Sequence, residues 1–597
     1  MLKDYEYLEQ PCRNYCFFKG ILINDPKDNK EKVVLSSFVA GGIGEVVIID
    51  PESGEGETIQ IPGDNGAWAL LNYKDEKLLV GTCGTYGYLH CLELKTREWK
   101  PSLRVEGISY IWDLALASDG KVYGGTYPGC VLLQYDPDLH TLTNLGPMTQ
   151  DEGNLYSRLV FTPAPGKVYV NCGMSSTWIG VYDIDKNEMS AVMEGCSIIE
   201  TTENYIYMRT PDGNKLFDPV TLNEIQNQSY LDEVNEKDDR LPTPSGHVMT
   251  LKNGNKIGVC GQRFFVLKPD ATQPEFSTIP GLPPPTEIFA LTSDEEGILW
   301  GTTGLGQTMF GYNPETGEYW NTDIVTVHGG EVYGIVSHNN KIYMTSYSGG
   351  DHMVYDPKQE WNQYENVNPH TLESIGPDYI RPQARSFVGP NDNVWTGWIA
   401  QYGKYGCAIT EIDTKTHEVR KYTDLVPGQG IGAITADAEN IYFTTNGSGN
   451  GLKSKSEEFY LVKMTKDGEI LNKKKFPLGT GLSCVYVVND KVLLYTMADG
   501  KSILRIYNGA TMEEEKSTEL DYVMGRMISM SNGNILAAIH KRGENRRYSA
   551  LAVMDPATLE FIQESELPGH SHAFCYNQKD GFIYFGHGSK LYRLKGE

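Results

Sequence analysis

The sequence predicts an all-β protein built as two β-propellers, and three observations support this prediction. Glycine (63 residues) and tyrosine (37 residues) are both abundant, which indicates many tight turns between aromatic-rich strands. A unit of about 46 residues recurs along the chain. Each unit contains short runs of alternating apolar and polar residues, separated by Asp-Gly, Asn-Gly or glycine-rich turns.

The recurring unit is clearest in residues 112–137, 288–314 and 332–357, each of which ends in Tyr-Asp-Pro or Tyr-Asn-Pro. A lone four-stranded sheet would expose two apolar faces and two edges. Stacking such sheets around an axis covers the faces, so closure into a propeller is favoured. The residues that open the second predicted strand of each unit are Lys32, Lys77, Lys121, Lys167, Tyr205, Lys256, Ile298, Lys341, Asn393, Asn440, Lys491, Asn534 and Phe582.

One ring typically holds four to eight blades, so these units require two rings with about 13–14 four-stranded blades, arranged as 7 + 7 or 6 + 7. We expect residues 1–285 to form an N-terminal propeller and residues 286–597 a C-terminal, seven-bladed one. The last unit lacks an outermost strand, which residues near the N-terminus are expected to supply; the alternative is an open last blade. Residues 226–244 fit a linker between rings and an inserted surface loop equally well.

The charge balance excludes several partners. The chain has 52 Lys and Arg against 78 Asp and Glu, a net charge of −26, which disfavours binding to nucleic acid or to an anionic membrane. The sequence has no long apolar run and no cationic, apolar leader. Its 11 cysteines form no CxxC pair and are expected to be free thiols in a reducing compartment. We therefore expect a cytoplasmic protein.

Three short motifs resemble a known family of repeats. They are GGTYPG at residues 124–129, YDP at residues 135–137 and NLGPM at residues 144–148. The combination is similar to the repeat of seven-bladed propeller enzymes that act on uronic-acid-containing glycans, the rhamnose-glucuronate lyases and related rhamnosidases. A weaker resemblance, confined to the blade pattern, extends to streptogramin lyase and to quinoprotein-type repeats. The resemblance implies a carbohydrate-active lyase or glycosidase that takes part in polysaccharide degradation.

Ligand sites of propellers gather near one mouth of the central channel and take residues from several blades. Aromatic platforms with a few cations suit a sugar ring that carries a carboxylate. β-Elimination beside a uronate needs that carboxylate neutralised, a base and an acid, roles that Arg, Tyr and His can fill. The predicted catalytic residues are Tyr127, Tyr156, Arg158 and His247, and the predicted substrate-binding residues are Trp68, Tyr86, Trp112, Trp178, Arg209 and Arg263. The alternative is that these side chains pack between sheets.

The second ring is richer in histidine. His328, Glu331, His570 and His572 are predicted to converge on the axis and to hold a divalent metal ion, because imidazole and carboxylate together suit first-row metals. The alternative is that these histidines are polar groups in surface turns. The sequence has no Walker loop, HExxH, EF-hand or GxSxG elbow, so it suggests no cofactor besides this metal.

Two functions follow. The first is an enzyme, a carbon-oxygen lyase or a glycoside hydrolase, whose partner is a uronate oligosaccharide or another small anionic ligand. The second is a non-catalytic propeller that binds a protein or a glycan as a scaffold.

Overall fold

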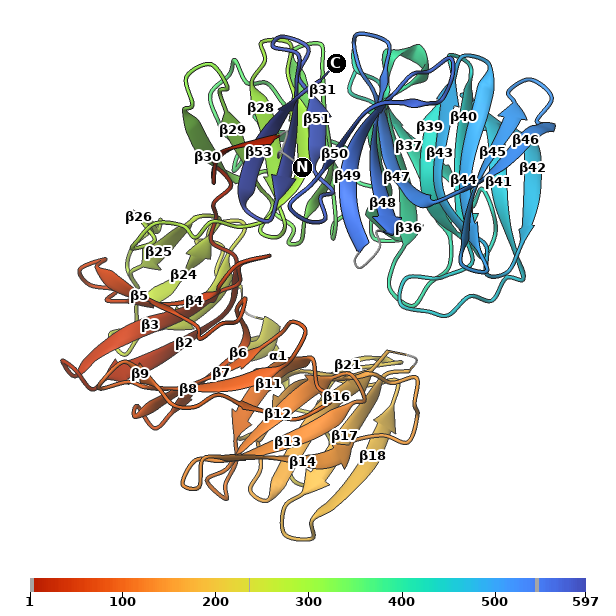
Figure 1. The fold of residues 1–597 in the computed structure, drawn as a ribbon. Coiled ribbons are helices and arrows are strands. Elements are labelled where there is room, and N and C mark those ends of the chain that lie inside the picture. The colour runs from red at the N-terminus through yellow and green to blue at the C-terminus, as the bar shows by residue number, and fades with distance from the viewer. Residues whose placement is uncertain (1–4, 175, 236, 543–546, 597) are drawn as a thin grey trace. The chain divides into compact units, whose positions relative to one another are not determined.

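The computed structural model describes residues 5–174, 176–235, 237–542 and 547–596. The chain divides into two compact units. The first unit comprises residues 15–284, and the second comprises residues 1–14 together with residues 285–597. Antiparallel sheets build both units, which confirms the predicted all-β fold (Figure 1).

The described strands of the first unit pair into six sheets. These are β2 (Phe17–Asp25), β3 (Lys30–Ser37), β4 (Glu45–Ile49) and β5 (Gly56–Gln60); β6 (Ala67–Tyr73), β7 (Lys77–Thr82), β8 (Tyr88–Glu93), β9 (Glu98–Trp99) and β10 (Leu103–Arg104); β11 (Tyr110–Leu116), β12 (Val122–Tyr127), β13 (Val131–Asp136) and β14 (Thr141–Pro147); β15 (Tyr156–Phe161), β16 (Lys167–Gly173), β17 (Trp178–Asp183) and β18 (Glu188–Glu194); β19 (Ser197–Thr201), β20 (Ile206–Thr210), β21 (Gly213–Phe217) and β22 (Glu224–Ile225); and β23 (Gly246–Thr250), β24 (Lys256–Cys260), β25 (Arg263–Leu267) and β26 (Glu275–Thr278).

The described strands of the second unit pair into seven sheets. These are β27 (Ile288–Ser293), β28 (Leu299–Thr303), β29 (Thr308–Tyr312) and β30 (Tyr319–Ile324); β31 (Val332–His338), β32 (Lys341–Ser346), β33 (Asp351–Tyr355) and β34 (His370–Thr371); β35 (Tyr379–Val388), β36 (Val394–Ala400), β37 (Cys407–Ile412) and β38 (Val419–Thr423); β39 (Gly430–Ala436), β40 (Asn440–Asn446), β41 (Glu458–Thr465) and β42 (Ile470–Pro477); β43 (Gly481–Val488), β44 (Lys491–Ala498), β45 (Lys501–Asn508) and β46 (Glu514–Leu520); β47 (Tyr522–Ser529), β48 (Ile535–Arg542), β49 (Arg547–Met554) and β50 (Phe561–Glu566); and β51 (Phe574–Tyr576), β52 (Phe582–His587), β53 (Lys590–Lys595) and β1 (Tyr5–Glu9). A short 3-10 helix, η1 (Pro390–Asp392), precedes β36.

The first strand of each sheet lies nearest the axis of its unit. In the first unit β2 contacts both β6 and β23, and in the second unit β27 contacts both β31 and β51. The first and last sheets of each unit are therefore neighbours. This radial arrangement of antiparallel sheets is that of a β-propeller.

The cores of both propellers lie between neighbouring sheets. Val80 of β7 packs with Val34 of β3 and Val46 of β4 across one such boundary. The middle strands are covered on both faces, and for this reason they read as continuous apolar runs. The residues of the outermost strands alternate between exposed and partly buried, as in β5, or are exposed along nearly the whole strand, as in β46.

The residues of the family-like motifs have structural roles here. A Cβ atom on Gly125 would lie 2.2 Å from the carbonyl oxygen of Ser157, so glycine permits the close approach of two sheets. The carboxylate of Asp136 accepts hydrogen bonds of 3.0 Å from the backbone N–H groups of Asp138 and Leu139. The YDP motif thus closes a turn, as Asp side chains commonly do.

The N-terminal strand completes the last sheet. β1 pairs antiparallel with β53, with Tyr5 opposite Leu594 and Tyr7 opposite Tyr592. Figure 1 shows this red strand beside the blue C-terminal strands. The second unit is therefore closed by pairing of segments from the two ends of the described chain.

The segment between β22 and β23 is an insertion within the first unit. It contains the helix α1 (Gln228–Asn235), whose Tyr230 ring lies 5.1 Å from that of Tyr205 on the preceding sheet. Further along, Asp238 accepts a hydrogen bond of 2.8 Å from Lys256 on the following sheet. The insertion therefore contacts both sheets that flank it. No helix in the described part of the chain has the length and apolar character needed to cross a bilayer.

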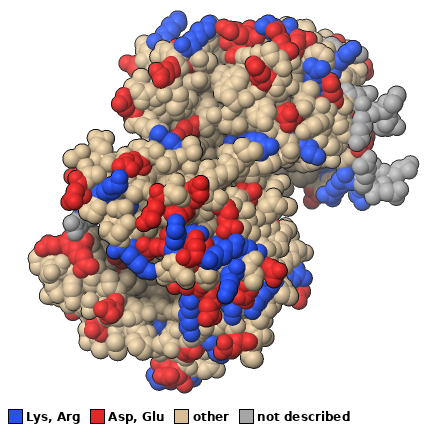
Figure 2. All heavy atoms as spheres, turned by 90° about the vertical axis from the view of Figure 1, so that its left-hand side faces the viewer, with Lys and Arg blue, Asp and Glu red and all other residues tan. Residues whose placement is uncertain are grey.

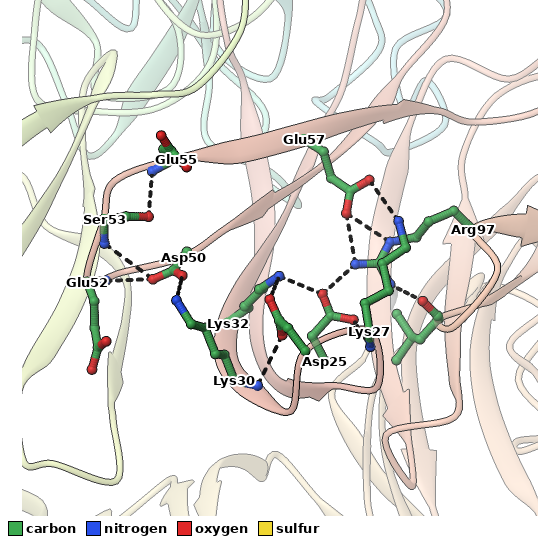
Figure 3. A network of polar contacts seen from close by, with 12 residues as sticks. Asp25, Lys27, Lys30, Lys32, Asp50, Glu52, Ser53, Glu55, Glu57 and Arg97 are labelled. Carbon is green, nitrogen blue, oxygen red and sulfur yellow. Dashed lines mark hydrogen bonds and ion pairs between the residues drawn. The ribbon is translucent and has the colours of Figure 1, made fainter.

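A network of ion pairs lies on the first unit (Figure 3). Asp25, which is fully buried, pairs with Lys32 at 2.8 Å and with Arg97 at 2.6 Å. Arg97 also pairs with Glu57 at 2.8 Å. The network joins the sheet of β2–β5 to the turn after β8. Acidic and basic side chains are intermixed in the same way over the face seen in Figure 2.

Candidate ligand-binding hubs

The innermost strands share an irregular start. In the first four sheets of the first unit, the strand register shifts across one residue near the start of the innermost strand. The residues within these shifts are Phe18, Trp68, Trp112 and Arg158. A bulge leaves its extra residue out of the ladder and redirects the side chain. Four sheets thereby present one side chain each at the same end of their first strands.

These side chains form a continuous cluster, which we call the aromatic hub: Phe18, Trp68, Trp112, Tyr156 and Arg158. The rings of Phe18 and Trp68 stack with centroids 4.0 Å apart, and Trp68 meets Trp112 edge-on at 4.4 Å. Tyr156 lies 5.7 Å from Trp112, and the Arg158 guanidinium lies 5.2 Å from the Trp112 ring. The hub combines a large apolar surface with one cation.

Two tyrosines extend the aromatic hub. Tyr127 lies 4.6 Å from Tyr156 and 5.0 Å from Tyr110, measured between ring centroids. Five of the ten predicted site residues of this unit therefore lie in the hub or against it. They are Trp68, Trp112, Tyr127, Tyr156 and Arg158.

The hub has hydrogen-bond donors that no described residue accepts. The indole N–H groups of Trp68 and Trp112 are buried and have no partner among the described residues. Arg158 is exposed, and in the described structure no carboxylate forms an ion pair with it. A ligand with several oxygen atoms would satisfy these donors.

Charged and titratable groups flank the hub. Lys19 pairs with Asp113 at 3.1 Å, and the other oxygen of this carboxylate accepts a hydrogen bond from the backbone N–H of Val160. His247 places Nε2 2.9 Å from the carbonyl oxygen of Phe17, so Nε2 is the donor and Nδ1 stays unprotonated. Burial lowers the pKa of His247, which favours this neutral form at pH 7.

The other four predicted residues make contacts outside the aromatic hub. Tyr86 is half exposed, and the Arg104 guanidinium lies 4.6 Å from its ring. Trp178 donates its indole N–H to Ser176 at 2.9 Å. Arg209 on β20 is exposed, opposite Ser197 of β19. Arg263 on β25 covers the Phe276 ring at 4.5 Å.

Phe18 was missed by the sequence reasoning, although a spacing signal was present for its equivalents. Trp68, Trp112 and Arg158 each stand nine residues before the residue predicted to open the second strand of their sheet. The β2–β3 hairpin is longer, so Phe18 does not keep this distance. The same spacing of eight or nine residues marks Phe289, Tyr333, Arg385 and Arg526 in the second unit.

The four predicted metal ligands do not form one group. His570 and His572 approach each other, with 2.9 Å between their Nε2 atoms. His328 instead places Nδ1 2.8 Å from the carboxylate of Asp351. Over the described ranges, no three His, Cys, Asp or Glu side chains are arranged to hold a metal ion.

Glu331 belongs to a different polar cluster. Burial raises the pKa of Glu331 to about 7, and the positive charge of Arg381 opposes this rise. Arg381 donates a hydrogen bond of 2.6 Å to the Tyr402 hydroxyl and lies 4.5 Å from the Tyr347 ring. One carboxylate oxygen of Glu331 is buried without a described partner. Glu331 is thus a carboxyl group that can exchange a proton near neutral pH.

A depression of 340 Å³ lies at the opposite end of the second unit's strands. Its lining includes the turn after β27, together with Trp300, Trp320 and Tyr355. The indole N–H of Trp300 donates to Asp294 there. The bulges lie at the other end of β27, so this depression is separate from the axial sites.

Comparisons with known proteins identify similar folds. No known protein family and no curated protein matches the chain. The solved structures that resemble it include the extracellular domain of a one-component system from B. thetaiotaomicron, with 12% identity, a TM-score of 0.27 and coverage of 99% of this chain and 82% of that one. A streptogramin B lyase is 16% identical, with a TM-score of 0.35 and coverage of 51% and 92%.

The propeller domain of Myceliophteria thermophila Cps50 (Swd1) is 9% identical, with a TM-score of 0.37 and coverage of 52% of this chain and 97% of that one. Similarities of this extent carry no argument about this chain. The strand pairing described above identifies it as a β-propeller protein.

Proposed function

We propose that the aromatic hub of the first unit binds a uronic-acid-containing oligosaccharide and that the protein cleaves it as a lyase. The observation that carries this proposal is the exposed Arg158 guanidinium beside Trp112 and Tyr156. Indole and phenol rings stack on the apolar faces of a sugar, and a guanidinium binds a carboxylate through paired hydrogen bonds. The free indole N–H groups of Trp68 and Trp112 suit hydroxyl oxygens.

The proposed chemistry is β-elimination. Arg158 neutralises the uronate carboxylate, which makes the C5 proton more acidic. His247, through its unprotonated Nδ1, or Tyr156, as a phenolate beside the Arg158 cation, takes that proton as the C4–O bond breaks and a C4–C5 double bond forms. Tyr127, with its ring 4.6 Å from that of Tyr156, returns a proton to the leaving oxygen.

A lyase fits this hub better than a hydrolase. Glycoside hydrolases usually need two carboxyl groups on either side of the scissile bond. Asp113, the carboxylate described beside the aromatic hub, is engaged by Lys19 and by the backbone N–H of Val160. The contacts of the aromatic hub described above therefore include no pair of free carboxyl groups.

The second candidate is non-catalytic binding of a glycan or a protein. The close stacking of Phe18 on Trp68 favours it, because rings that pack on each other also serve as a rigid binding platform. We further propose a reducing compartment such as the cytoplasm, since all 11 cysteines are buried and none of them forms a disulfide.

The experiment is incubation with rhamnose-glucuronate-capped and other uronate oligosaccharides. A rise in the ultraviolet absorbance of an unsaturated uronate supports the lyase. Released sugar without that absorbance indicates a hydrolase, and calorimetric binding without turnover indicates the second candidate. Neither turnover nor binding across the panel would overturn the sugar proposal altogether.

A further inference from the structure

The bulged positions of the second unit carry different side chains from those of the first. The register shifts enclose Phe289 in β27, Tyr333 in β31, Arg385 in β35 and Arg526 in β47. The corresponding shifts in β39 and β43 enclose only small residues, Gly432 with Ala433, and Ser483. Two of these positions therefore carry arginines, whereas the four bulged positions described in the first unit carry three aromatic rings and one arginine, Arg158.

Arg385 reaches across the axis. It donates hydrogen bonds from Nη1 to the carbonyl oxygen of Phe289 at 3.1 Å and to that of His572 at 3.4 Å. Its guanidinium lies 5.0 Å from the Phe289 ring. The sheets of β27, β35 and β51 are not all neighbours in the ring, so these contacts are made at its centre.

Arg526 approaches the same segment. Its guanidinium lies 5.6 Å from the ring of Phe574, two residues after His572. Burial, together with the positive charge of Arg526, lowers the pKa of Arg385 to about 9. In the described structure neither guanidinium forms an ion pair with a carboxylate; Glu287 acts on Arg385 only through space.

Histidines complete the surroundings of the two arginines. His570 and His572 contact each other through Nε2, and the His540 ring lies 4.7 Å from that of His570. Burial lowers the pKa of His572 to about 4, with further contributions from His570 and Arg385. These imidazoles are neutral at pH 7, so they offer N–H donors without adding charge.

We infer that this cationic hub, formed by Arg385, Arg526 and His572, binds a small oxyanion, either a carboxylate or a phosphate group. Burial of the two guanidinium groups costs free energy, and so does their mutual repulsion, since no counter-ion is described beside them. A bound oxyanion offsets both costs. Guanidinium forks match the oxygens of both groups, and a neutral imidazole adds a donor. The inference does not depend on sugar cleavage at the aromatic hub.

The test is isothermal titration of the full chain with inorganic phosphate and, separately, with glucuronate, with glucose as the neutral control. We expect binding of at least one anion, and weakening of at least about tenfold in Arg385→Met and in Arg526→Met. The phosphate and glucuronate arms distinguish the two anion classes. Arg104→Met, which removes an exposed arginine of the first unit, is the matched control and should bind as the wild type does.

Thermal unfolding gives a second readout. Without anion, Arg526→Met should be at least as stable as the wild type, because it removes one of two repelling charges. With the anion that binds, the wild type should gain more melting temperature than either methionine variant. If a methionine variant does not fold, Arg526→Lys replaces it. The anion affinity of this variant should again fall by at least about tenfold, because lysine lacks the paired N–H donors of a guanidinium. Absence of anion binding by the wild type, or unchanged binding in the arginine variants, would overturn the inference.

Discussion

The two hubs of this protein occupy the same place in the same kind of sheet, yet they differ in chemistry. In the first unit, bulges present Phe18, Trp68 and Trp112, which pack on one another, with Arg158 at the edge. In the second unit, bulges present Arg385 and Arg526, which have no described carboxylate partner. The β-bulge decides where a side chain reaches the axis, and the residue type decides what that side chain can bind.

The largest expected effect concerns Arg158. We expect Arg158→Met to abolish turnover of uronate oligosaccharides, because the substrate carboxylate loses its counter-ion. The melting temperature should change little, since this side chain is exposed. The control is Lys186→Met, which removes an exposed cation of the same unit from the turn after β17. Retained activity in Arg158→Met, or a large loss of stability, would assign Arg158 a structural role instead.

The next effect concerns the packing of the aromatic hub. Trp112 touches Trp68, Tyr110 and Tyr156, so Trp112→Ala should lower the free energy of unfolding by about 3 kcal/mol. Trp112→Phe keeps an aromatic ring and should cost less. Urea denaturation measures both. Equal stability of Trp112→Ala and the wild type would show that the rings form a binding surface without supporting the fold.

A comparable loss is expected away from either hub, in the ion-pair network of Figure 3. Asp25→Asn should cost about 3 kcal/mol, because it leaves Arg97 and Lys32 short of a buried counter-charge. Burial pushes the pKa of Asp25 upward, but hydrogen bonds from Arg97 and Lys32 outweigh it and hold the pKa below its ordinary value. The stabilisation is thus present above the unfolded-state pKa and is lost as the pH falls through the folded-state pKa.

Denaturation at a series of acidic pH values checks this sign. The difference in stability between the wild type and Asp25→Asn should shrink as the pH falls. A difference that stays constant would mean that Asp25 contributes through its shape rather than its charge.

The smallest effect concerns Glu331 in the second unit. Its pKa is raised to about 7 by burial, so the folded protein holds a proton that the unfolded chain releases at lower pH. The wild type should therefore lose stability as the pH rises from the unfolded-state pKa through 7. Glu331→Gln should gain about 2 kcal/mol relative to the wild type between pH 5.5 and 8.5. A difference in stability between Glu331→Gln and the wild type that does not change with pH would show that Glu331 is ionised throughout this range.

The repeat pattern predicted much of the fold. Lys77, Lys167 and Lys341 each begin the second strand of their sheet, because alternation of apolar residues and turn chemistry are local properties. Trp112 and Arg158 each lie near the start of an innermost strand, where mouth residues were expected. Tyr86, in the loop between β7 and β8, and Trp178, at the start of β17, were also expected at the mouth, but their described contacts are with other neighbours.

The approach of Arg385 to Phe289 and His572 could not be predicted from local sequence. It depends on which sheets face one another across the axis, and that follows only from closure of the ring. The metal-ligand prediction for His328 and His570 assumed that their side chains approach each other across the axis. His328 instead pairs with Asp351 of its own sheet, 23 residues along the chain.

The most direct test of the contrast between the hubs is calorimetric titration of the wild type, Arg158→Met and Arg526→Met with a glucuronate-capped oligosaccharide, followed by competition with phosphate. We expect two binding events in the wild type. Arg158→Met should remove one of them, and Arg526→Met the other, with phosphate displacing only the event that depends on Arg526. A single event that both variants abolish, or two events that neither variant affects, would contradict the account.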